Sequence, residues 1–368
     1  MDNRSFPTLA SLRLSHFRNY ESSEIEPHPG INLFVGQNAQ GKTNLLESIH
    51  LLSTGRLLRG SRDAQGIRAG ESLAEVEGVL SGSGTTITVQ FDDQKRRKKS
   101  VKLNGVGLPR ASDIIGRLPS VSFSTSDLSI VRGEPADRRS FLDTELAQLY
   151  PAYLNHLTDY KKALHQRNVL LKQAQEAYVE DALFEVWEEQ LAIHGSEIRK
   201  YRQGWIEDLL PRASEEHKNV SSGEVLVMTY VAKDEAGSAD EMLQAMEEVR
   251  GLDVRRGSGS IGPHRDDVLI EIDEKEARTY GSQGQQRTAV LSIKLATLES
   301  GVNILGVPPV LLLDDVFSDL DQSRRHNLIS EALKLGGQVF ITCTETEQVG
   351  VDLMDASKVF RVRSGTVT

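Results

Sequence analysis

The sequence is short of residues that several protein classes require. It contains one cysteine among 368 residues, so an internal disulfide is excluded, and Cys343 in the apolar stretch "FITC" fits a small buried side chain. No run approaches the ~18 consecutive apolar residues that a membrane helix needs. The opening "MDNRSFPTLASLRL" lacks the basic-then-apolar order of a signal peptide. We therefore expect a cytoplasmic protein without a membrane partner.

Positive charge is also scarce. The chain has 43 Lys and Arg against 53 Asp and Glu, a formal net charge of −10, so its overall field repels a polyanion. Contact with DNA would have to be local. The most concentrated positive charge is the run from Lys95 to Lys99, between the strand-like stretches "TTITVQF" and "SVKLNGV". This predicted hairpin tip either contacts DNA or is simply solvated, and the sequence leaves both open.

Hydrophobic periodicity divides the chain into two kinds of segment. Alternation in "LASLRLSHF", "LAEVEGVL" and "TTITVQFDD" predicts strands, and "KTNLLESIHLLS" predicts a helix with one apolar face. From about Ser126 apolar residues recur three and four apart, which is typical of helices. Strands return after the glycine-rich "VRRGSGSIGPHRDD". We predict a discontinuous α/β lobe, residues 1–125 and 255–368, interrupted by an inserted, mostly helical lobe, residues 126–254.

The stretch "FVGQNAQGKTNLLESI" has the spacing of a phosphate-binding loop between a strand and a helix. Glycines let backbone N–H groups wrap around phosphate oxygens, and the helix start adds a positive dipole end. Lys42 would reach the β and γ phosphates, and the Thr43 hydroxyl would bind Mg²⁺. The stretch predicts ATP and Mg²⁺ as cofactors, with phosphates held by Gly36, Gln37, Asn38, Ala39, Gln40, Gly41, Lys42 and Thr43.

A second element is "PPVLLLDDVFSDLD". Val310 to Leu313 form an apolar run typical of a buried parallel strand, and two carboxylates follow where the strand would end. Ligands of open α/β sheets bind at the carboxyl ends of strands. We predict Asp314 as the Mg²⁺ partner and Asp315 as the general base, with Lys42 assisting catalysis. The alternative is that these residues only begin a turn, a common position for aspartate.

A third element, Ser282 to Arg287 in "SQGQQR", precedes an amphipathic helix. Serine and glycine at a helix start make an anion site, although the same residues could only cap the helix. This stretch resembles the signature motif of ATP-binding-cassette (ABC) ATPases, and "LLLDDVFSDLD" resembles their second nucleotide motif with the following loop, Ser318 to Asp321. Together with "LRLSHFRNY", "GEPADRRSFLD" and "GPHRDD", the order and spacing resemble the RecF family of SMC-like DNA-repair ATPases nearly end to end.

The resemblance implies an ABC-type P-loop ATPase lobe and a homodimer that forms with ATP and clamps DNA. The signature of one subunit would close over the ATP of the other, and an N-terminal pair would approach the nucleotide. The implied residues are Ser282, Gln283, Gly284 and Gln285 in the signature, and Arg18 and Asn19 near the N-terminus. Arg138, Arg139 and "GPHRDD" are interpreted as structural.

The resemblance also implies a setting and a rate. The partners would be DNA (duplex, gapped or with a single-strand to double-strand junction) and the RecR and RecO proteins of recombinational repair. Asp315 stands where transporters carry glutamate, and Thr342 to Thr344 stand where they carry a histidine sensor. A shorter base reaches water less readily, so we expect weak, DNA-dependent hydrolysis that acts as a timer.

Other classes share parts of this pattern. A transporter subunit fits poorly because a large helical insertion separates Thr43 from Ser282. The ATPase head of another SMC-like complex would carry coiled-coil arms of hundreds of residues. A P-loop kinase would transfer phosphate to an acceptor, and a pure DNA-binding module would release no phosphate.

Overall fold

The structure, a computed structural model, describes residues 8–58, 63–96, 98–221, 223–316, 328–330, 334–345 and 354–368. The chain forms two compact units. We call Met1–Asp127 with Thr297–Thr368 the phosphate-loop unit, and Leu128–Ala296 the signature unit, after the motif that each contains.

Of the two predicted boundaries of the inserted lobe, the first lies close to a boundary between the compact units and the second does not. The predicted entry into the inserted lobe at residue 126 lies close to Leu128, but the chain returns to the first unit at Thr297 rather than at residue 255. The reason is that β10 (Asp267–Ile272) pairs with β9 (Leu226–Val231) inside the signature unit. A change from helix to strand composition therefore did not mark a change of unit.

One sheet of the phosphate-loop unit is antiparallel, with strand order β2-β1-β4-β5-β6-β7. Its alternating sequences bury one face, and β4 to β7 form an antiparallel meander. The strands are β1 (Leu9–Ser15), β2 (Ser22–Ile25), β4 (Leu73–Leu80), β5 (Thr86–Asp92), β6 (Lys99–Leu103) and β7 (Val106–Gly107).

The second sheet of this unit has the order β15-β14-β3-β13-β12-β8. All neighbours from β14 to β8 are parallel, so their carboxyl ends lie along one edge, and only β15 runs antiparallel. The strands are β3 (Ile31–Val35), β8 (Ser120–Phe123), β12 (Val310–Leu313), β13 (Val339–Cys343), β14 (Ser357–Arg363) and β15 (Thr366–Val367). β3, β12 and β13 are buried along their whole length, as the apolar run from Val310 to Leu313 predicted for β12.

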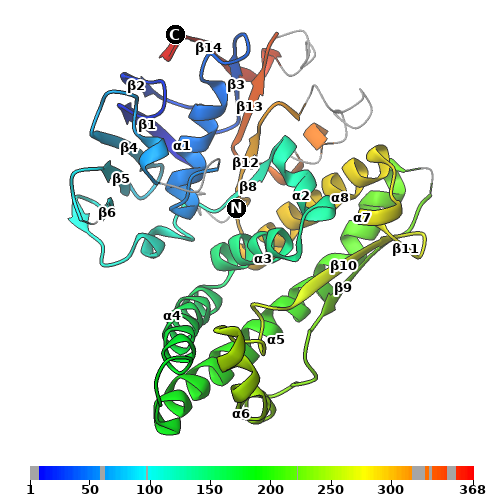
Figure 1. The fold of residues 1–368 in the computed structure, drawn as a ribbon. Helices are drawn as coiled ribbons and strands as arrows, with labels where there is room; N and C mark the ends of the chain where they lie inside the picture. Colours follow the sequence, from blue (N-terminus) through cyan, green and yellow to red (C-terminus); the bar gives the residue numbers. More distant parts are fainter. Residues whose placement is uncertain are drawn as a thin grey trace. The chain divides into compact units, whose positions relative to one another are not determined.

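Helix α1 (Lys42–Thr54) fills the space between these two sheets (Figure 1). Its predicted apolar face is buried in one cluster with side chains from both sheets, among them Leu12, Val76, Phe34 and Phe340. Phe34 stacks on Phe340 with ring centroids 5.8 Å apart. The core of the unit thus fixes the helix that begins at Lys42.

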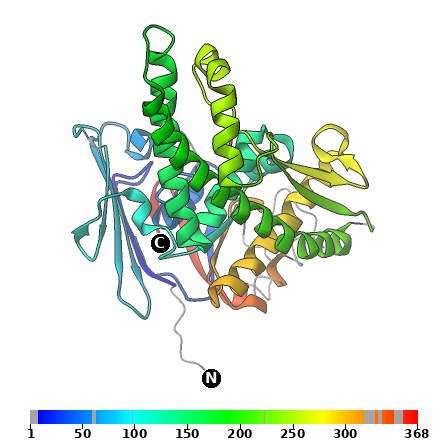
Figure 2. The same cartoon turned by 90° about the horizontal axis from the view of Figure 1, so that it is seen from below.

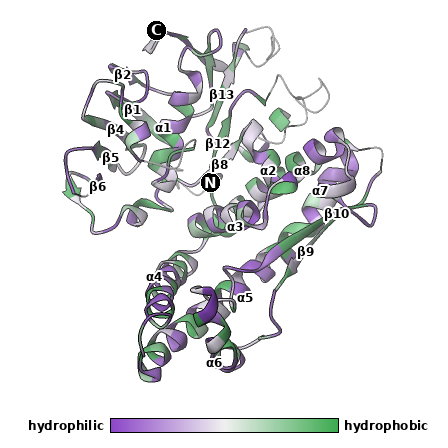
Figure 3. Cartoon of the chain, viewed as in Figure 1, coloured by the Kyte–Doolittle hydropathy of each residue, from purple (hydrophilic) through white to green (hydrophobic). Residues whose placement is uncertain are grey.

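The signature unit is mostly helical, as predicted for the insertion. Helices α4 and α5 run side by side in both views (Figures 1 and 2), and hydrophobic and hydrophilic residues alternate along them (Figure 3), as amphipathic helices require. Its elements are α2 (Ser129–Arg132), α3 (Pro135–Leu149), α4 (Pro151–Gln173), α5 (Asp181–Val220), β9, α6 (Ala239–Arg256), β10, β11 (Lys275–Glu276), α7 (Ala277–Tyr280) and the first part of α8 (Gln283–Leu305).

Buried ion pairs also hold the signature unit together. Arg167 Nη1 contacts Asp253 at 2.8 Å and its Nη2 contacts Glu188 at 2.9 Å, with all three side chains at most 1% exposed. Arg199 bridges Asp234 and Asp266 in the same manner. Burying such charges is tolerated when each has a partner. Arg167 thereby joins α4 to α5 and α6, whereas Arg199 joins α5 to the segments that precede α6 and β10.

By length and composition α8 is the one described helix that could cross a membrane. However, 72% of its most apolar window is buried inside the protein, as in the core helix of a water-soluble fold.

Candidate nucleotide-binding site

The loop after β3 has a backbone shape that favours glycine at two positions. A Cβ on Gly36 would lie 2.2 Å from the Val362 carbonyl oxygen of β14, which is far inside contact distance. Gly41 has φ 118°, and a Cβ there would lie 2.7 Å from the Asn19 side chain. Ala39 also has a left-handed φ of 64°. Positive φ at a non-glycine residue is uncommon and concentrates at functional sites.

Lys42 turns its side chain back along this loop. Its Nζ donates to the carbonyl oxygens of Gly36 and Gln37, at 2.5 and 2.9 Å. Burial lowers the pKa of Lys42, while the nearby negative charges of Asp315 and Asp314 oppose that effect. The ammonium group is therefore held beside the loop backbone, where a phosphate could replace its two carbonyl partners.

Thr43 and Asp314 meet at the carboxyl edge of the parallel sheet. Thr43 Oγ1 donates to Asp314 Oδ1 at 2.8 Å, and Thr342 Oγ1 of β13 donates to the same oxygen at 3.1 Å. The Thr342 hydroxyl also accepts from the backbone N–H of Asp315 at 2.8 Å. Asp314 is 2% exposed. Helix α1 and strand β13 thus place two hydroxyl groups around one carboxylate oxygen of Asp314, the residue that follows β12.

These oxygens suit Mg²⁺ in character. Mg²⁺ prefers hard oxygen ligands and usually takes one or two protein carboxylates together with phosphates and waters. In the described part of the chain no group of three or more His, Cys, Asp and Glu is placed to hold a metal. A metal at Thr43 and Asp314 would therefore depend on the nucleotide for its other ligands.

Asp315, the predicted base, is exposed at the end of β12 while Asp314 beside it is buried. Asp315 has a left-handed φ of 53°, and its N–H is fixed by Thr342. This turn sends the two adjacent carboxyl groups into different environments, so the structure separates a buried acid from a solvent-accessible one.

The predicted N-terminal pair contacts the phosphate loop and the helix that follows it. The Arg18 guanidinium donates to both carboxylate oxygens of the fully buried Glu47 of α1, at 2.7 and 2.8 Å. Asn19 Nδ2 donates to the Gln40 carbonyl oxygen at 2.9 Å, and the Tyr20 hydroxyl donates to the Gly41 carbonyl oxygen at 3.0 Å. Arg18 is thus engaged with α1, and Asn19 with the backbone of the phosphate loop.

Gln40 is also held by the C-terminal turn. Its Oε1 accepts from the Ser364 N–H at 2.8 Å, and its carbonyl oxygen accepts from the Gly365 N–H at 3.0 Å. The Gln40 side chain therefore secures the loop, which leaves its backbone N–H as the group available to a phosphate. Gln37 and Asn38, the remaining predicted contacts, lie in the exposed crest of the same loop.

The signature residues Ser282, Gln283 and Gly284 lie exposed where α8 begins. The Ser282 N–H donates to Gln285 Oε1 at 2.8 Å, and the Gln285 N–H donates to Ser282 Oγ at 3.2 Å. This reciprocal pair is a capping arrangement. The interpretation of the stretch as a helix cap is thus correct, and the cap also leaves the exposed serine and glycine at the positive end of a helix dipole.

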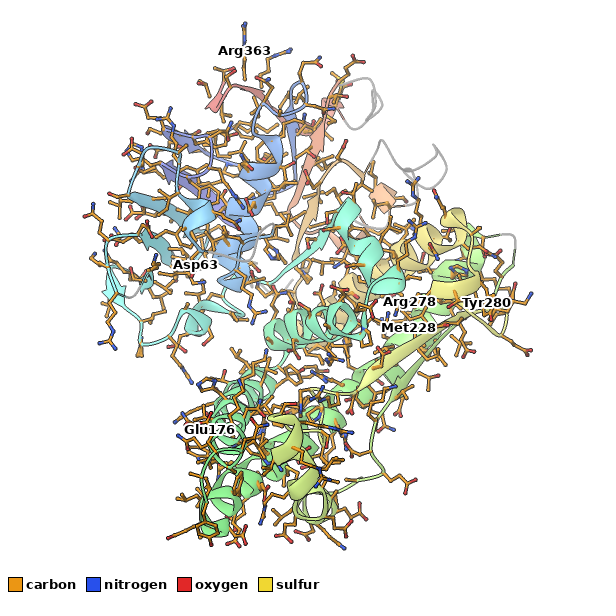
Figure 4. The ribbon with its side chains drawn as sticks, viewed as in Figure 1. Asp63, Glu176, Met228, Arg278, Tyr280 and Arg363 are labelled. Atoms are coloured by element: carbon orange, nitrogen blue, oxygen red, sulfur yellow. The ribbon has the colours of Figure 1, made fainter. Side chains whose placement is uncertain are left out.

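The basic run lies at the predicted hairpin tip between β5 and β6, but much of its charge is matched. Lys95 contacts Asp92 at 2.9 Å and Lys98 contacts Asp93 at 2.6 Å, both on the exposed surface. Lys99 Nζ contacts Asp63, labelled in Figure 4, at 2.9 Å and donates to the Gly55 carbonyl oxygen at 3.0 Å. Lys99 is therefore a structural residue. Arg97 lies outside the described residues.

The residues interpreted as structural do make internal contacts. Arg138 donates to both oxygens of Asp267, at 2.7 and 2.9 Å, and Arg139 donates to the Asp266 carbonyl oxygen at 2.7 Å. Asp266 in turn pairs with Arg199. Cys343 is buried, as expected from its apolar neighbours.

Sequence reasoning assigned no role to Thr342, Tyr20 and Glu47. Threonine on a buried strand and an acid inside a helix give no local signal of function, although Tyr20 follows the predicted pair directly. The loop from Ser318 to Asp321 lies outside the described residues.

Comparison with known proteins agrees with this geometry. Residues 8–368 match the family model described as "RecF/RecN/SMC N terminal domain". The chain is 42% identical to the DNA replication and repair protein RecF of Symbiobacterium thermophilum, covering 98% of this chain and 97% of that protein. It is 37% identical to RecF of Staphylococcus aureus, covering 98% and 99%.

Solved structures give the same result. The structure of the recombination mediator protein RecF with ATP in the RecFOR pathway is similar to this chain, with a TM-score of 0.90 and 33% identity, covering 100% of this chain and 99% of that one. An Smc head domain from Pyrococcus furiosus, at 17% identity and a TM-score of 0.56, shares the fold, covering 98% of this chain and 95% of that one. The predicted ABC-type ATPase fold is therefore confirmed, and the chain belongs to the RecF family of DNA replication and repair proteins.

Proposed function

We propose that this chain is an ATP-controlled DNA-binding protein of recombinational DNA repair, acting in the cytoplasm. ATP would join two copies into a dimer that clamps DNA, and slow hydrolysis would release it. The observation that carries the proposal is the 2.8 Å contact between Thr43 Oγ1 and Asp314 Oδ1. It joins the phosphate loop to the acidic strand end at the edge of the sheet where nucleotides bind.

Each residue at this edge has a role in the proposal. Backbone N–H groups of the loop that follows Gly36, whose own N–H donates to the Cys343 carbonyl oxygen, would bind phosphate oxygens, and Lys42 would place its charge between the β and γ phosphates. Thr43 and Asp314 would hold Mg²⁺, which when bound neutralises charge on the phosphates. Asp315, exposed at the strand end, would accept the proton of the attacking water. An aspartate base is short, which supports a slow rate.

The second half of the site would come from another copy of the chain. Ser282, Gln283 and Gly284 are exposed at the N-terminus of a 23-residue helix, where backbone N–H groups and the helix dipole favour an anion. In the proposal they bind the γ phosphate held by the partner copy. A symmetric pair then contains two such composite sites, so ATP acts as part of the interface.

DNA and the repair partners are proposed from the family. The relatives are named DNA replication and repair proteins, and two solved relatives are described as recombination mediator proteins of the RecFOR pathway. We infer that the DNA is duplex, gapped or junction-containing, and that RecR and RecO are partners. With a net charge of −10, the DNA-binding surface must be local, and dimerisation would double it.

Two alternatives make different predictions. A head of an SMC-like complex carries long coiled-coil arms, whereas the α4–α5 pair has helices of only 23 and 40 residues. A P-loop kinase would transfer labelled phosphate from ATP to a small acceptor. The proposal predicts release of free phosphate instead.

Fluorescence anisotropy of a labelled duplex tests the proposal. We expect tight binding with ATP, weaker binding without nucleotide, and no gain from ATP in Lys42→Met. Duplex, gapped and single-stranded DNA of equal length would rank the DNA structures. Binding that is equal with and without ATP would contradict ATP control.

A further inference from the structure

Gln285 makes three hydrogen bonds that shape the signature turn, two through its side chain and one through its backbone N–H. Its Oε1 accepts from the Ser282 N–H at 2.8 Å, and its backbone N–H donates to Ser282 Oγ at 3.2 Å. Its Nε2 donates to Glu224 Oε1 at 2.8 Å. A side-chain amide has one acceptor oxygen and one donor nitrogen. The Glu224 contact therefore fixes which end of the amide faces Ser282.

Glu224 is itself held in place by contacts other than the one with Gln285. Its backbone N–H donates to Ser221 Oγ at 3.1 Å. The next residue, Val225, exchanges two hydrogen bonds with Asp273, at 2.9 and 3.0 Å. The Glu224 side chain is 27% exposed, so solvent only partly screens the carboxylate. The segment between α5 and β9 thus presents a fixed acceptor to the signature.

A buried histidine lies behind this carboxylate. His217, in the last turn of α5, is 0% exposed, and its Nε2 lies 3.5 Å from Glu224 Oε2. Burial lowers the pKa of His217, and the charge of Glu224 opposes that effect. A neutral imidazole leaves the carboxylate charge for Gln285. The two oxygens of Glu224 therefore face different partners, one the end of α5 and the other the signature.

The neighbouring glutamine has a different role. Gln286 is 4% exposed, its Nε2 donates to the Ala277 carbonyl oxygen at 2.8 Å, and its Oε1 accepts from Arg132. Ala277 begins α7, the helix that also carries Arg278 and Tyr280, which Figure 4 labels. Gln286 anchors the start of α8 to the unit, whereas Gln285 shapes the exposed turn. The Gln286 backbone N–H donates to the Ser282 carbonyl oxygen at 3.0 Å, but of the two glutamine side chains the described contacts link only that of Gln285 to Ser282.

From these contacts we propose that Glu224 is a positioning residue for the signature. It orients the Gln285 amide so that Ser282 and Gly284 take the conformation that binds the partner copy's phosphate. The proposal rests on the proposed function, in which the signature acts on the partner's ATP. Glu224 touches no nucleotide in it and acts through Gln285 alone.

Exchanging the donor and the acceptor tests the contact. Gln285→Glu alone sets two carboxylates against each other, so it should disturb the turn. The double variant Glu224→Gln with Gln285→Glu restores one donor facing one acceptor, and the new carboxylate can still accept from the Ser282 N–H. Glu224→Ala removes the acceptor, and Glu215→Ala, at an exposed position near the same end of α5, is the matched control.

Amide hydrogen exchange measures how well the hydrogen bonds of the signature turn are formed, and it does not require a dimer. The N–H groups of Ser282 and Gln285 are both bonded in the structure. Losing a charge-assisted hydrogen bond should speed their exchange roughly tenfold or more in Glu224→Ala and Gln285→Glu. The swapped double variant and Glu215→Ala should match the parent. Unchanged exchange in both single variants would overturn the inference, whatever the dimer does.

Sedimentation with a non-hydrolysable ATP analogue then measures the consequence. If each of two composite sites weakens about tenfold, the dimer dissociation constant should rise on the order of a hundredfold, with nucleotide binding to the monomer unchanged. The double variant should recover. Disturbed exchange with an unchanged dimer would overturn the positioning role. A parent protein that never dimerises with ATP would instead contradict the proposed function.

Discussion

The interiors of the two units are stabilised by different kinds of interaction. The phosphate-loop unit packs α1 into one apolar cluster between two sheets, and its loop is shaped by backbone geometry at Gly36 and Gly41. The signature unit depends more on matched buried charges, such as Arg167 with Asp253, and its exposed motif is shaped by side-chain amides. Apolar packing tolerates small changes, whereas a charge network fails when one member is lost. Side-chain substitutions should therefore disturb the signature unit more.

The largest effect should follow from breaking the charge network. Arg167→Met leaves Asp253 buried without its arginine partner, and removing one member of a buried pair costs about 3–5 kcal/mol. Urea unfolding would show a much lower midpoint for the transition of the signature unit. Arg13→Ala, which removes an exposed guanidinium from the other unit, should leave the midpoint nearly unchanged. Equal midpoints for the two variants would refute the contrast between the units.

Two variants of the phosphate-loop unit should separate the defect in ATP hydrolysis from the defect in ATP binding. Asp315→Asn removes the proposed base, so hydrolysis should fall by roughly 10²–10⁴-fold while ATP still binds and the dimer accumulates. Lys42→Met should instead lose nucleotide affinity. Phosphate release and binding of a fluorescent ATP analogue measure the two defects. Hydrolysis at the parental rate in Asp315→Asn would show that another residue is the base.

Protonation of His264 should lower the stability of the signature unit as the pH falls. Its Nδ1 lies 2.6 Å from the Tyr160 hydroxyl, and burial lowers the pKa of His264 to about 4, below the usual value near 6.5. The unfolded chain therefore binds the proton first. Stability is complete above about pH 6.5 and falls by up to about 3 kcal/mol as the pH drops towards 4.

The His264→Gln variant isolates this contribution. Urea midpoints at pH 7, 5.5 and 4.5 should fall less steeply in the variant than in the parent protein, because the glutamine does not titrate. Parallel pH profiles for the two proteins would show that His264 does not contribute.

The sequence predicted the parts of the site that depend on local patterns. The loop from Gly36 to Thr43 and the strand before Asp314 follow from short-range periodicity and glycine spacing. Contacts between distant residues gave no such signal. Thr342 reaches Asp314 only because β13 pairs with β12, and Arg18 reaches Glu47 only after the chain folds. Glu224 could not be singled out because its role depends on the position of Gln285.

The predicted return to the α/β lobe at residue 255 differs from the observed return at Thr297 for a similar reason. Strand β10 looks like a return to the α/β lobe by composition, but its partner is β9. Pairing between strands decides which unit a strand joins, and a local pattern does not specify the partner. By contrast, the acids that pair with the basic run are its neighbours in "DDQKRRKK", so part of that charge matching is readable in the sequence.

The smallest effect should come from the hairpin tip. Replacing Lys95, Arg96, Arg97 and Lys98 with serine should flatten the slope of log DNA affinity against log salt by about one to three, since each phosphate contact contributes up to ~0.9. Lys99 is kept because it supports Gly55 and Asp63. Anisotropy across a salt series, with and without ATP, measures the slope, and the loss should be similar on any duplex. An unchanged slope would mean that the tip is only solvated.

Mixing two inactive variants tests the central claim most directly. Lys42→Met spoils the phosphate loop, and Ser282→Arg places a bulky cation in the signature, so each protein alone should stay monomeric in sedimentation with a non-hydrolysable ATP analogue. If the site is shared between copies, a mixed pair joins the intact loop of one to the intact signature of the other. The account predicts that a dimer appears only in the mixture. A dimer of Ser282→Arg alone, or a mixture that remains monomeric, would contradict it.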